Sequence, residues 1–317
     1  MKYYQLNNGD RIPALGLGTW KSPTGEVYLA VQEALKIGYR HIDCAPIYRN
    51  EAEIGQAFTE AITSGAVKRE DLWITSKLWS NAHQQERVIP AIKETLTDLR
   101  LDYLDLFLIH WPIVLRPEVL LPETGEDLRP LEEVPLEETW QGMQMALQEG
   151  LCRHIGVSNF NQKKLASLNQ VSGPKPEVNQ VESHPYLQQN DLLTYCRSEG
   201  ILLTAYSPLG SKDRPEMLKK PDEPSLLDHP LVQKIAAQYH LTPAQLLIAW
   251  GINRGTVVIP KSVNSARLKE NFAAAEIVLD TEAMEEIAAL ERGYRFVDGS
   301  FWERPGSPYT MANLWND

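Results

Sequence analysis

Seven short apolar runs constrain the fold of this chain, because each ends in a polar or reactive residue and a helical pattern separates most of them. Buried strands that alternate with helices predict a parallel sheet with helices on its outside. When such a sheet closes into a barrel, the carboxyl ends of its strands lie on one face, where barrel active sites form. The runs span residues 41–48, 73–79, 106–112, 155–160, 178–184, 202–208 and 257–262.

A glycine-rich run, Ala14–Thr19, supplies an eighth strand, so we expect an α/β fold, the (β/α)8 TIM barrel. Two stretches, Tyr3–Leu6 and Arg11–Leu15, flank an Asn-Asn-Gly-Asp turn and predict a hairpin that covers the bottom of the barrel. Helical periodicity predicts two helices before the last strand and an extra helix near the end. The predicted helices are Glu26–Ile37, Glu51–Ser64, Gln84–Leu99, Leu136–Gln148, Leu187–Ser198, Leu231–Tyr239, Ala244–Asn253, Ala266–Ala274 and Glu282–Leu290.

Composition argues against several classes of protein. The net charge of −11 argues against a surface for nucleic acid or anionic membranes, which attract basic patches. The N-terminal residues lack the apolar segment of a secretory signal, and no apolar stretch approaches the roughly 20 residues that span a bilayer. Three cysteines without metal-ligand spacing favour free thiols in a reducing compartment. We therefore expect a cytoplasmic protein in which residues 1–317 form a single barrel domain.

Three connections are longer than the usual few residues: Ile113–Pro135, Gly210–His229 and the tail Gly293–Asp317. The first and third hold many proline, glycine and charged residues, which is typical of irregular loops. Two of the three leave the carboxyl ends of strands, so we expect them to rim the mouth of the active site. Long loops in a compact domain are usually lids or binding loops.

Four side chains near the ends of consecutive predicted strands form a possible proton-donating group: Asp43, Tyr48, Lys77 and His110. Taken singly, each has an ordinary structural explanation, such as a helix cap, a solvated lysine or a buried histidine. Together they have a chemical logic, because a lysine ammonium lowers the phenol pKa from its usual value of about 10. A carboxylate beside the lysine keeps that lysine charged, and the histidine can donate a second hydrogen bond to the same substrate oxygen.

Other catalytic schemes have less support in the sequence. The histidines are scattered without metal-ligand spacing, so we expect no metal. The Gly-x-Ser-x-Gly elbow of serine hydrolases is absent. The run Gly16-Leu17-Gly18 lacks the third glycine of the doubly wound dinucleotide fold.

The sequence resembles the aldo-keto reductase superfamily, and is most similar to the branch that contains aldose reductase, aldehyde reductase and plant aldehyde-detoxifying reductases. The resemblance covers nearly the whole chain and rests on the motifs GLGTW (16–20), HIDCAPIYRNE (41–51), TSKLW (75–79), LIHWP (108–112), GVSNF (156–160), NQVESHPY (179–186), AYSPLGS (205–211) and IPKSVNSARLKENF (259–272).

The resemblance implies a monomeric barrel that reduces a small carbonyl substrate with NADPH, with Asp43, Tyr48, Lys77 and His110 as the catalytic residues and Tyr48 as the proton donor. It also implies that the nicotinamide stacks on a tyrosine, that three polar residues hold its carboxamide, and that the long loop contacts the pyrophosphate. The implied cofactor-binding residues are Gly18, Thr19, Trp20, Asp43, Ser158, Asn159, Gln180, Tyr206, Ser207, Pro208, Leu209, Ser211, Ile259, Lys261, Ser262, Val263, Arg267, Glu270 and Asn271.

The preference for NADPH has a second argument in the residues themselves. Lys261 and Arg267 flank Ser262 at the start of a predicted helix. Two cations at a helix N-terminus suit a phosphate group, and we assign them to the 2′-phosphate of NADPH. A metabolic barrel with a phosphate site would also explain these cations, but it would leave Tyr48 and Lys77 without a role.

An aromatic wall is expected around the reactive group, because tryptophans follow several of the polar strand ends. Such a wall favours apolar or aromatic aldehydes over highly charged sugars. Two other functions stay open: dehydrogenation of a specific alcohol or hydroxysteroid by the same residues, and an NADPH-binding regulatory subunit with slow turnover. The predicted substrate-binding residues are Trp20, Ile47, Tyr48, Trp79, His110, Trp111 and Trp302.

Overall fold

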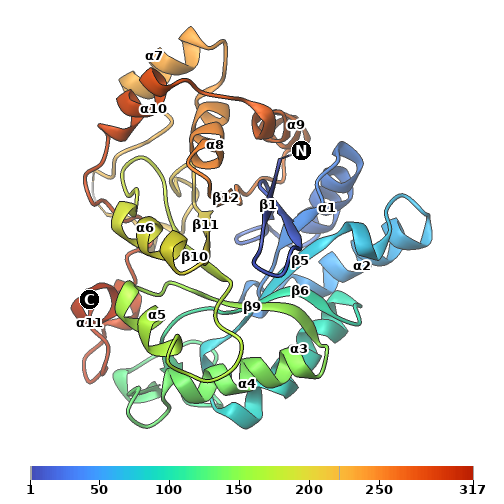
Figure 1. Ribbon diagram of the computed structural model, residues 1–317, viewed down its shortest axis with the longest axis vertical. Helices are drawn as coiled ribbons and strands as arrows, with labels where there is room; N and C mark the ends of the chain where they lie inside the picture. The colour runs from blue at the N-terminus through green and yellow to red at the C-terminus, as the bar shows by residue number, and fades with distance from the viewer. Residues whose placement is uncertain (1, 221, 317) are drawn as a thin grey trace.

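A closed parallel barrel forms the centre of the structure, a computed structural model that describes residues 2–220 and 222–316. Helices surround the strands (Figure 1), as the sequence predicts. In the described residues the parallel sheet has eight strands, which neighbour one another in chain order. They are β3 (Leu17–Gly18), β4 (His41–Asp43), β5 (Trp73–Leu78), β6 (Leu104–Ile109), β9 (Cys152–Ser158), β10 (Val178–Glu182), β11 (Leu202–Tyr206) and β12 (Val257–Val258).

The barrel closes where the first and last strands meet. Parallel bridges join Leu15 to Val258 and Gly18 to Lys261, and the Gly16 amide donates to the Val258 carbonyl at 2.9 Å. A Cβ on Gly18 would lie 2.8 Å from the Ile259 carbonyl oxygen, so glycine permits this close approach. Strand β3 is shorter than the predicted strand 14–19, because Leu15 pairs with Val258 only through an isolated bridge.

Helices form in the predicted order, with ends that differ by a few residues. The short helix after β9 was not predicted, because its seven residues hold only two buried apolar side chains. Two helices lie between β11 and β12, and α10 follows α9, as predicted, whereas the five-residue helix α11 in the tail was not predicted. The helices are α1 (Glu26–Ile37), α2 (Glu51–Thr63), α3 (Gln85–Leu99), α4 (Leu136–Gln148), α5 (Gln162–Leu168), α6 (Asn190–Ser198), α7 (Pro230–Gln238), α8 (Pro243–Asn253), α9 (Ser265–Ala273), α10 (Thr281–Ala288) and α11 (Met311–Trp315).

An N-terminal hairpin covers the bottom of the barrel, as predicted. Strands β1 (Tyr3–Gln5) and β2 (Arg11–Pro13) pair antiparallel. Buried Leu6 and Ile12 pack in one cluster with strand side chains such as Val178. A layer of apolar contacts between the strands and the surrounding helices forms the larger core. The bottom of the barrel is therefore closed, and the opposite face is left for a site.

The long loops and the tail pack together rather than remaining irregular. Residues 113–135 contain the antiparallel pair β7 (Val114–Leu115) and β8 (Leu128–Arg129), which the sequence did not predict. The Tyr309 hydroxyl joins both strands, since it accepts from the Val114 amide at 2.9 Å and donates to the Arg129 carbonyl at 2.7 Å. Among the described residues, no helix is long and apolar enough to cross a membrane.

Candidate active site

A buried ion pair lies at the carboxyl ends of β4 and β5. The Lys77 ammonium donates to the Asp43 carboxylate at 2.6 Å and to the Cys44 carbonyl at 2.8 Å. Its third contact is the Tyr48 hydroxyl, at 3.4 Å. Tyr48 ends the short 3-10 helix η1 (Pro46–Tyr48) that follows β4. Three of the four predicted catalytic side chains therefore share hydrogen bonds.

The electrostatics of this group differ in one respect from the sequence prediction. Desolvation disfavours the Lys77 ammonium, but Asp43 and Tyr48 outweigh it and raise the pKa of Lys77 above its usual value. Lys77 is therefore charged at neutral pH. Desolvation raises the pKa of Tyr48 to about 12, although Lys77 lowers it. Lys77 thus lowers the Tyr48 pKa, as predicted, but desolvation of the phenol is the larger effect, and the sequence does not reveal it.

His110 follows β6 and lies beside the phenol. The Tyr48 and His110 rings are 5.8 Å apart in an edge-on arrangement. Burial and the nearby Lys77 charge hold the pKa of His110 well below its usual value, so its imidazole is neutral. Its Nδ1 atom is buried without a hydrogen-bond partner among the described residues. A neutral imidazole carries one N–H, which His110 can offer to an oxygen bound in the site.

A chain of hydrogen bonds extends from Asp43 to the ends of β9 and β10. The Gln180 amide donates to the second Asp43 oxygen at 2.7 Å, and the Ser158 hydroxyl donates to the Gln180 carbonyl at 2.7 Å. Asn159 has a left-handed backbone, with φ of 65°. Its side-chain nitrogen, Nδ2, donates to the His110 backbone carbonyl at 2.9 Å. The four strand ends are thus fixed relative to one another.

Tyr206, at the end of β11, joins this chain of hydrogen bonds. Its hydroxyl donates to the Asn159 side-chain oxygen at 2.8 Å, so the position of its ring is tied to β9. The Thr19 hydroxyl, after β3, donates to the Asp43 carbonyl at 2.7 Å. The predicted nicotinamide-binding residues therefore border Asp43 and Lys77, as a cofactor above the barrel strands would require.

The loop after β11 folds back over the barrel mouth and pairs with two cations. Asp213 contacts Lys21 at 2.5 Å and Lys261 at 3.5 Å, and Lys21 also donates to the Ser211 hydroxyl at 3.1 Å. Ser207 begins the loop in a left-handed conformation, with φ of 49°. Sequence reasoning missed Lys21 and Asp213, because nothing in a sequence pairs two charged residues 192 positions apart.

Helix α9 begins next to Lys261 and carries the remaining predicted phosphate and adenine contacts. The Asn264 side chain caps the helix by accepting from the Arg267 amide at 3.0 Å, and the Ser262 hydroxyl accepts from the Asn264 amide at 3.1 Å. Arg267 is exposed and Asn271 is buried.

One predicted adenine contact is partly occupied within the protein. A Glu270 carboxylate oxygen accepts from Thr242 at 2.5 Å, which leaves the other oxygen for a ligand.

The residues around the barrel mouth fit a phosphorylated dinucleotide. Cations from three segments, Lys21, Lys261 and Arg267, lie on the face where β3 and β12 end and α9 begins, in a chain whose net charge is −11. Such a set suits phosphate groups. The other predicted cofactor residues lie at or within five residues of the carboxyl ends of β3, β11 and β12: Gly18, Thr19, Trp20, Pro208, Leu209, Ile259 and Val263.

Aromatic side chains pack beside His110 and Tyr48. The Trp79 ring lies 5.2 Å from His110 and 5.9 Å from Trp302, and Trp302 lies 5.9 Å from Trp111. The Trp79 indole donates to the Leu120 carbonyl at 2.7 Å, so the loop 113–135 fixes its orientation. The structure thus brings the predicted pocket residues into one apolar cluster, with Trp20 and Ile47 packed at its edge.

The tail contributes more to this pocket than the sequence suggested. Phe301 lies 5.5 Å from Trp111, and Trp315 lies 5.9 Å from the same ring. Both residues were missed, because the pattern of the tail gives no sign of which side chains turn inward.

Comparisons with known proteins agree with this geometry. Residues 14–292 match the aldo/keto reductase family. An aldo/keto reductase of Synechocystis sp. is 58% identical over 317 residues, which cover 100% of this chain and 97% of that protein. Aldo-keto reductase family 1 member A1 of Gallus gallus is 46% identical over 93% of this chain and 90% of that protein.

Among solved structures, the aldose reductase from Schistosoma japonicum has a TM-score of 0.87 and 42% identity, and the match covers 95% of this chain and 96% of that one. The fold and the family therefore agree over nearly the full length. The chain belongs to the aldo/keto reductase family and is an oxidoreductase.

Proposed function

We propose that this protein reduces aldehydes, and some ketones, to alcohols with NADPH. One observation carries the proposal: the Tyr48 hydroxyl lies 3.4 Å from an ammonium that is itself bound to a buried carboxylate. The aromatic cluster beside it offers a dry space for an apolar carbonyl compound. A carbonyl oxygen there would meet two possible donors, Tyr48 and His110.

The proposed chemistry needs one proton and one hydride. Bound NADPH supplies the hydride to the carbonyl carbon. As negative charge develops on the carbonyl oxygen, Tyr48 gives it the phenolic proton, and a neutral His110 donates a hydrogen bond that orients the same oxygen. Lys77 remains an ammonium and stabilises the phenolate that forms. Asp43 keeps Lys77 charged and Gln180 holds Asp43 in place.

The cations at the mouth support NADPH over NADH. Lys261 and Arg267 exceed what a pyrophosphate alone requires, and both lie near the amino end of α9. A 2′-phosphate would add a doubly charged group to this pair. The carboxylate of Asp213 competes for Lys261, so phosphate binding there replaces part of an existing ion pair.

The direct test follows the absorbance of the reduced cofactor while a panel of carbonyl compounds is added. The panel contains benzaldehyde, 4-nitrobenzaldehyde, propanal, a ketone and an aldose, each with NADPH and with NADH. We expect turnover with NADPH, weak activity with NADH and the lowest KM for aromatic aldehydes. An Arg267→Ala variant should lose affinity for NADPH but not for NADH. Equal use of both cofactors, or no turnover of any carbonyl compound, would contradict the proposal.

A further inference from the structure

The start of the C-terminal tail is held by hydrogen bonds to Glu182, at the carboxyl end of β10. Glu182, at the end of β10, is fully buried. Its two carboxylate oxygens accept from the backbone amides of Phe296 and Val297, each at 2.7 Å. His184 contacts the same carboxylate at 2.7 Å. With residues 296 and 297 held in this way, the path of the tail toward the pocket is set from residue 298 onward.

Asp298 is the first residue beyond this anchor, and three bonds converge on it. Its carboxylate accepts from the Ser300 amide at 3.0 Å and pairs with the Lys220 ammonium at 2.8 Å. Its backbone carbonyl accepts from the Trp315 indole at 2.6 Å. Directly after it, the 3-10 helix η7 (Ser300–Trp302) places Trp302 in the aromatic cluster. The position of Asp298 therefore affects two rings that enclose the substrate pocket.

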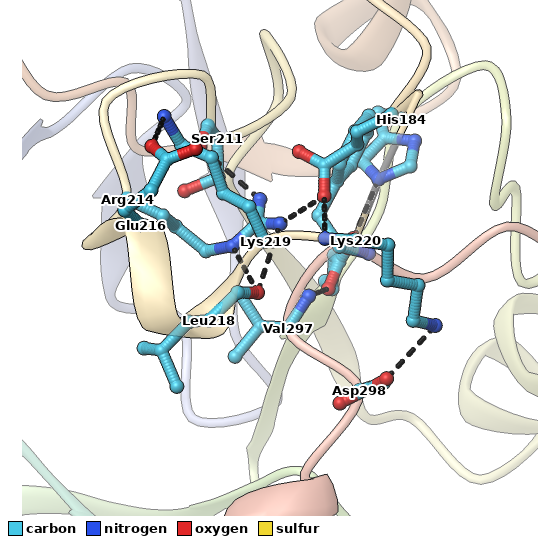
Figure 2. A network of polar contacts seen from close by, with 12 residues as sticks. His184, Ser211, Arg214, Glu216, Leu218, Lys219, Lys220, Val297 and Asp298 are labelled. Carbon is cyan, nitrogen blue, oxygen red and sulfur yellow. Dashed lines mark hydrogen bonds and ion pairs between the residues drawn. The ribbon is translucent and has the colours of Figure 1, made fainter.

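Lys220 belongs to the loop after β11, the loop that folds over the candidate cofactor site. Figure 2 shows the Lys220 side chain extending to Asp298, with Arg214 and Ser211 of the same loop at the left of the view. Arg214 is buried, pairs with Glu223, and donates to the Leu218 and Ser211 carbonyls at 3.2 and 3.1 Å. These contacts of Arg214 link the residues of the loop between Ser211 and Lys220 to one another.

The same loop thus touches both halves of the site. At one end Asp213 and Ser211 contact Lys21, and Asp213 also contacts Lys261, at the expected phosphate positions. At the other end Lys220 holds Asp298, and the Arg214 guanidinium lies 5.5 Å from the Phe296 ring. A change in the loop on dinucleotide binding would reach the tail through these contacts.

We propose that Lys220 and Asp298 are positioning residues that couple occupancy of the cofactor site to the shape of the substrate pocket. The proposal rests on the proposed function, because it needs a dinucleotide under the loop. Neither residue touches the reacting atoms. Their ion pair selects the tail position in which Trp302 and Trp315 close the aromatic wall, so bound dinucleotide tightens binding of a bulky aldehyde, and the aldehyde tightens binding of the dinucleotide equally.

The expected effect is moderate, because the pair is only partly buried. The Lys220 side chain is 53% exposed and that of Asp298 is 15% exposed. Ion pairs of this kind change an equilibrium by about two- to fivefold. We therefore expect the KM for a bulky aromatic aldehyde to rise by about two- to fivefold when the pair is broken, with little change for a small aldehyde that does not reach the tail.

The test uses the variants Lys220→Met and Asp298→Asn and the conservative variant Lys220→Arg, all of which keep an acceptor at residue 298 for the Ser300 amide. Lys219→Met is the matched control, because Lys219 is adjacent but pairs with Glu216 inside the loop. For each protein, KM and kcat are measured with 4-nitrobenzaldehyde and with propanal. Affinity for NADP⁺ is measured by tryptophan fluorescence with and without 4-nitrobenzyl alcohol.

The proposal predicts a higher KM for 4-nitrobenzaldehyde in the two single variants. It also predicts that 4-nitrobenzyl alcohol no longer changes their affinity for NADP⁺, so that the ratio of the two affinities, the coupling factor, is near one. It predicts values near wild type in Lys220→Arg and in Lys219→Met. Wild-type KM and coupling in both single variants would overturn it, and so would losses of the same size in Lys220→Arg, which keeps the positive charge. A wild-type protein that does not bind NADP⁺ at all would instead refute the proposed function.

Discussion

Two buried basic side chains, Lys77 and His154, lie at opposite ends of this barrel, and both contact carboxylates. At the top, Lys77 is bound to Asp43. At the bottom, the His154 ring lies between Asp10 at 3.0 Å and Glu177 at 3.1 Å, and stacks on Trp73 with ring centres 5.1 Å apart. The bottom cluster ties the N-terminal hairpin to β9.

The two clusters differ in what remains free. Both ring nitrogens of His154 have carboxylate partners, so nothing there is left to react. At the top, the phenol of Tyr48 receives only a 3.4 Å bond from Lys77. The comparison teaches that a buried cluster whose polar atoms are all partnered stabilises the fold, whereas a cluster that leaves a hydroxyl incompletely partnered has a group available for chemistry.

The largest expected effect is a loss of kcat in the double variant Lys77→Met/Asp43→Asn, which removes the ion pair at the top of the barrel. The double change avoids leaving Asp43 buried without a partner, which would cost stability. We expect kcat to fall by about 10²–10⁴-fold. In the single variant Lys77→Met, the alkaline limb of the pH–rate profile should move to higher pH, because Lys77 lowers the pKa of Tyr48. An unshifted profile would show that Lys77 does not act on the phenol.

At the bottom of the barrel, His154→Gln should lower the stability of the fold and leave the activity unchanged. The change removes charge-assisted hydrogen bonds to Asp10 and Glu177, so we expect unfolding to become easier by about 1–3 kcal/mol. Because His154 lies at the other end of the barrel, kcat and KM should equal those of wild type. Urea unfolding and steady-state kinetics on the same preparation measure both effects. A large loss of kcat without loss of stability would reverse the proposed roles of the two ends.

A smaller effect concerns the pH dependence of stability. Desolvation opposes the charged form of His154, but Glu177 and Asp10 outweigh it and raise its pKa above 6.5 in the folded protein. A group with a raised pKa contributes stability that is fully present below 6.5 and is lost as pH rises through the folded value, by up to about 1.4 kcal/mol per pH unit. The stability difference between wild type and His154→Gln should therefore shrink as pH rises above 6.5. A constant difference would contradict the pKa direction.

Much of the barrel could be predicted, because its strands and helices leave regular patterns of apolar residues. The structure confirms the eight parallel strands, the hairpin and the paired helices before β12. It also brings Asp43, Tyr48 and Lys77 within hydrogen-bonding range. Position at a strand end was sufficient information for these residues, because parallel strands all end on the same face.

The parts that could not be predicted depend on contacts between distant segments. Lys21 with Asp213, and Lys220 with Asp298, are pairs of ordinary charged residues in loops, and no periodicity marks them. The strands β7 and β8 contain two residues each, too few for an alternating pattern. The net direction of the Tyr48 pKa shift could not be predicted, because desolvation depends on the packed neighbours rather than on the local motif.

The most direct test of the central proposal is single-turnover reduction of 4-nitrobenzaldehyde by NADPH in wild type and in Tyr48→Phe. The variant removes only the hydroxyl, so its unfolding midpoint and NADPH affinity should match those of wild type. We predict that the rate of the chemical step falls by about 10²–10⁴-fold. A variant that binds NADPH and reduces the aldehyde at the wild-type rate would show that Tyr48 is not the proton donor.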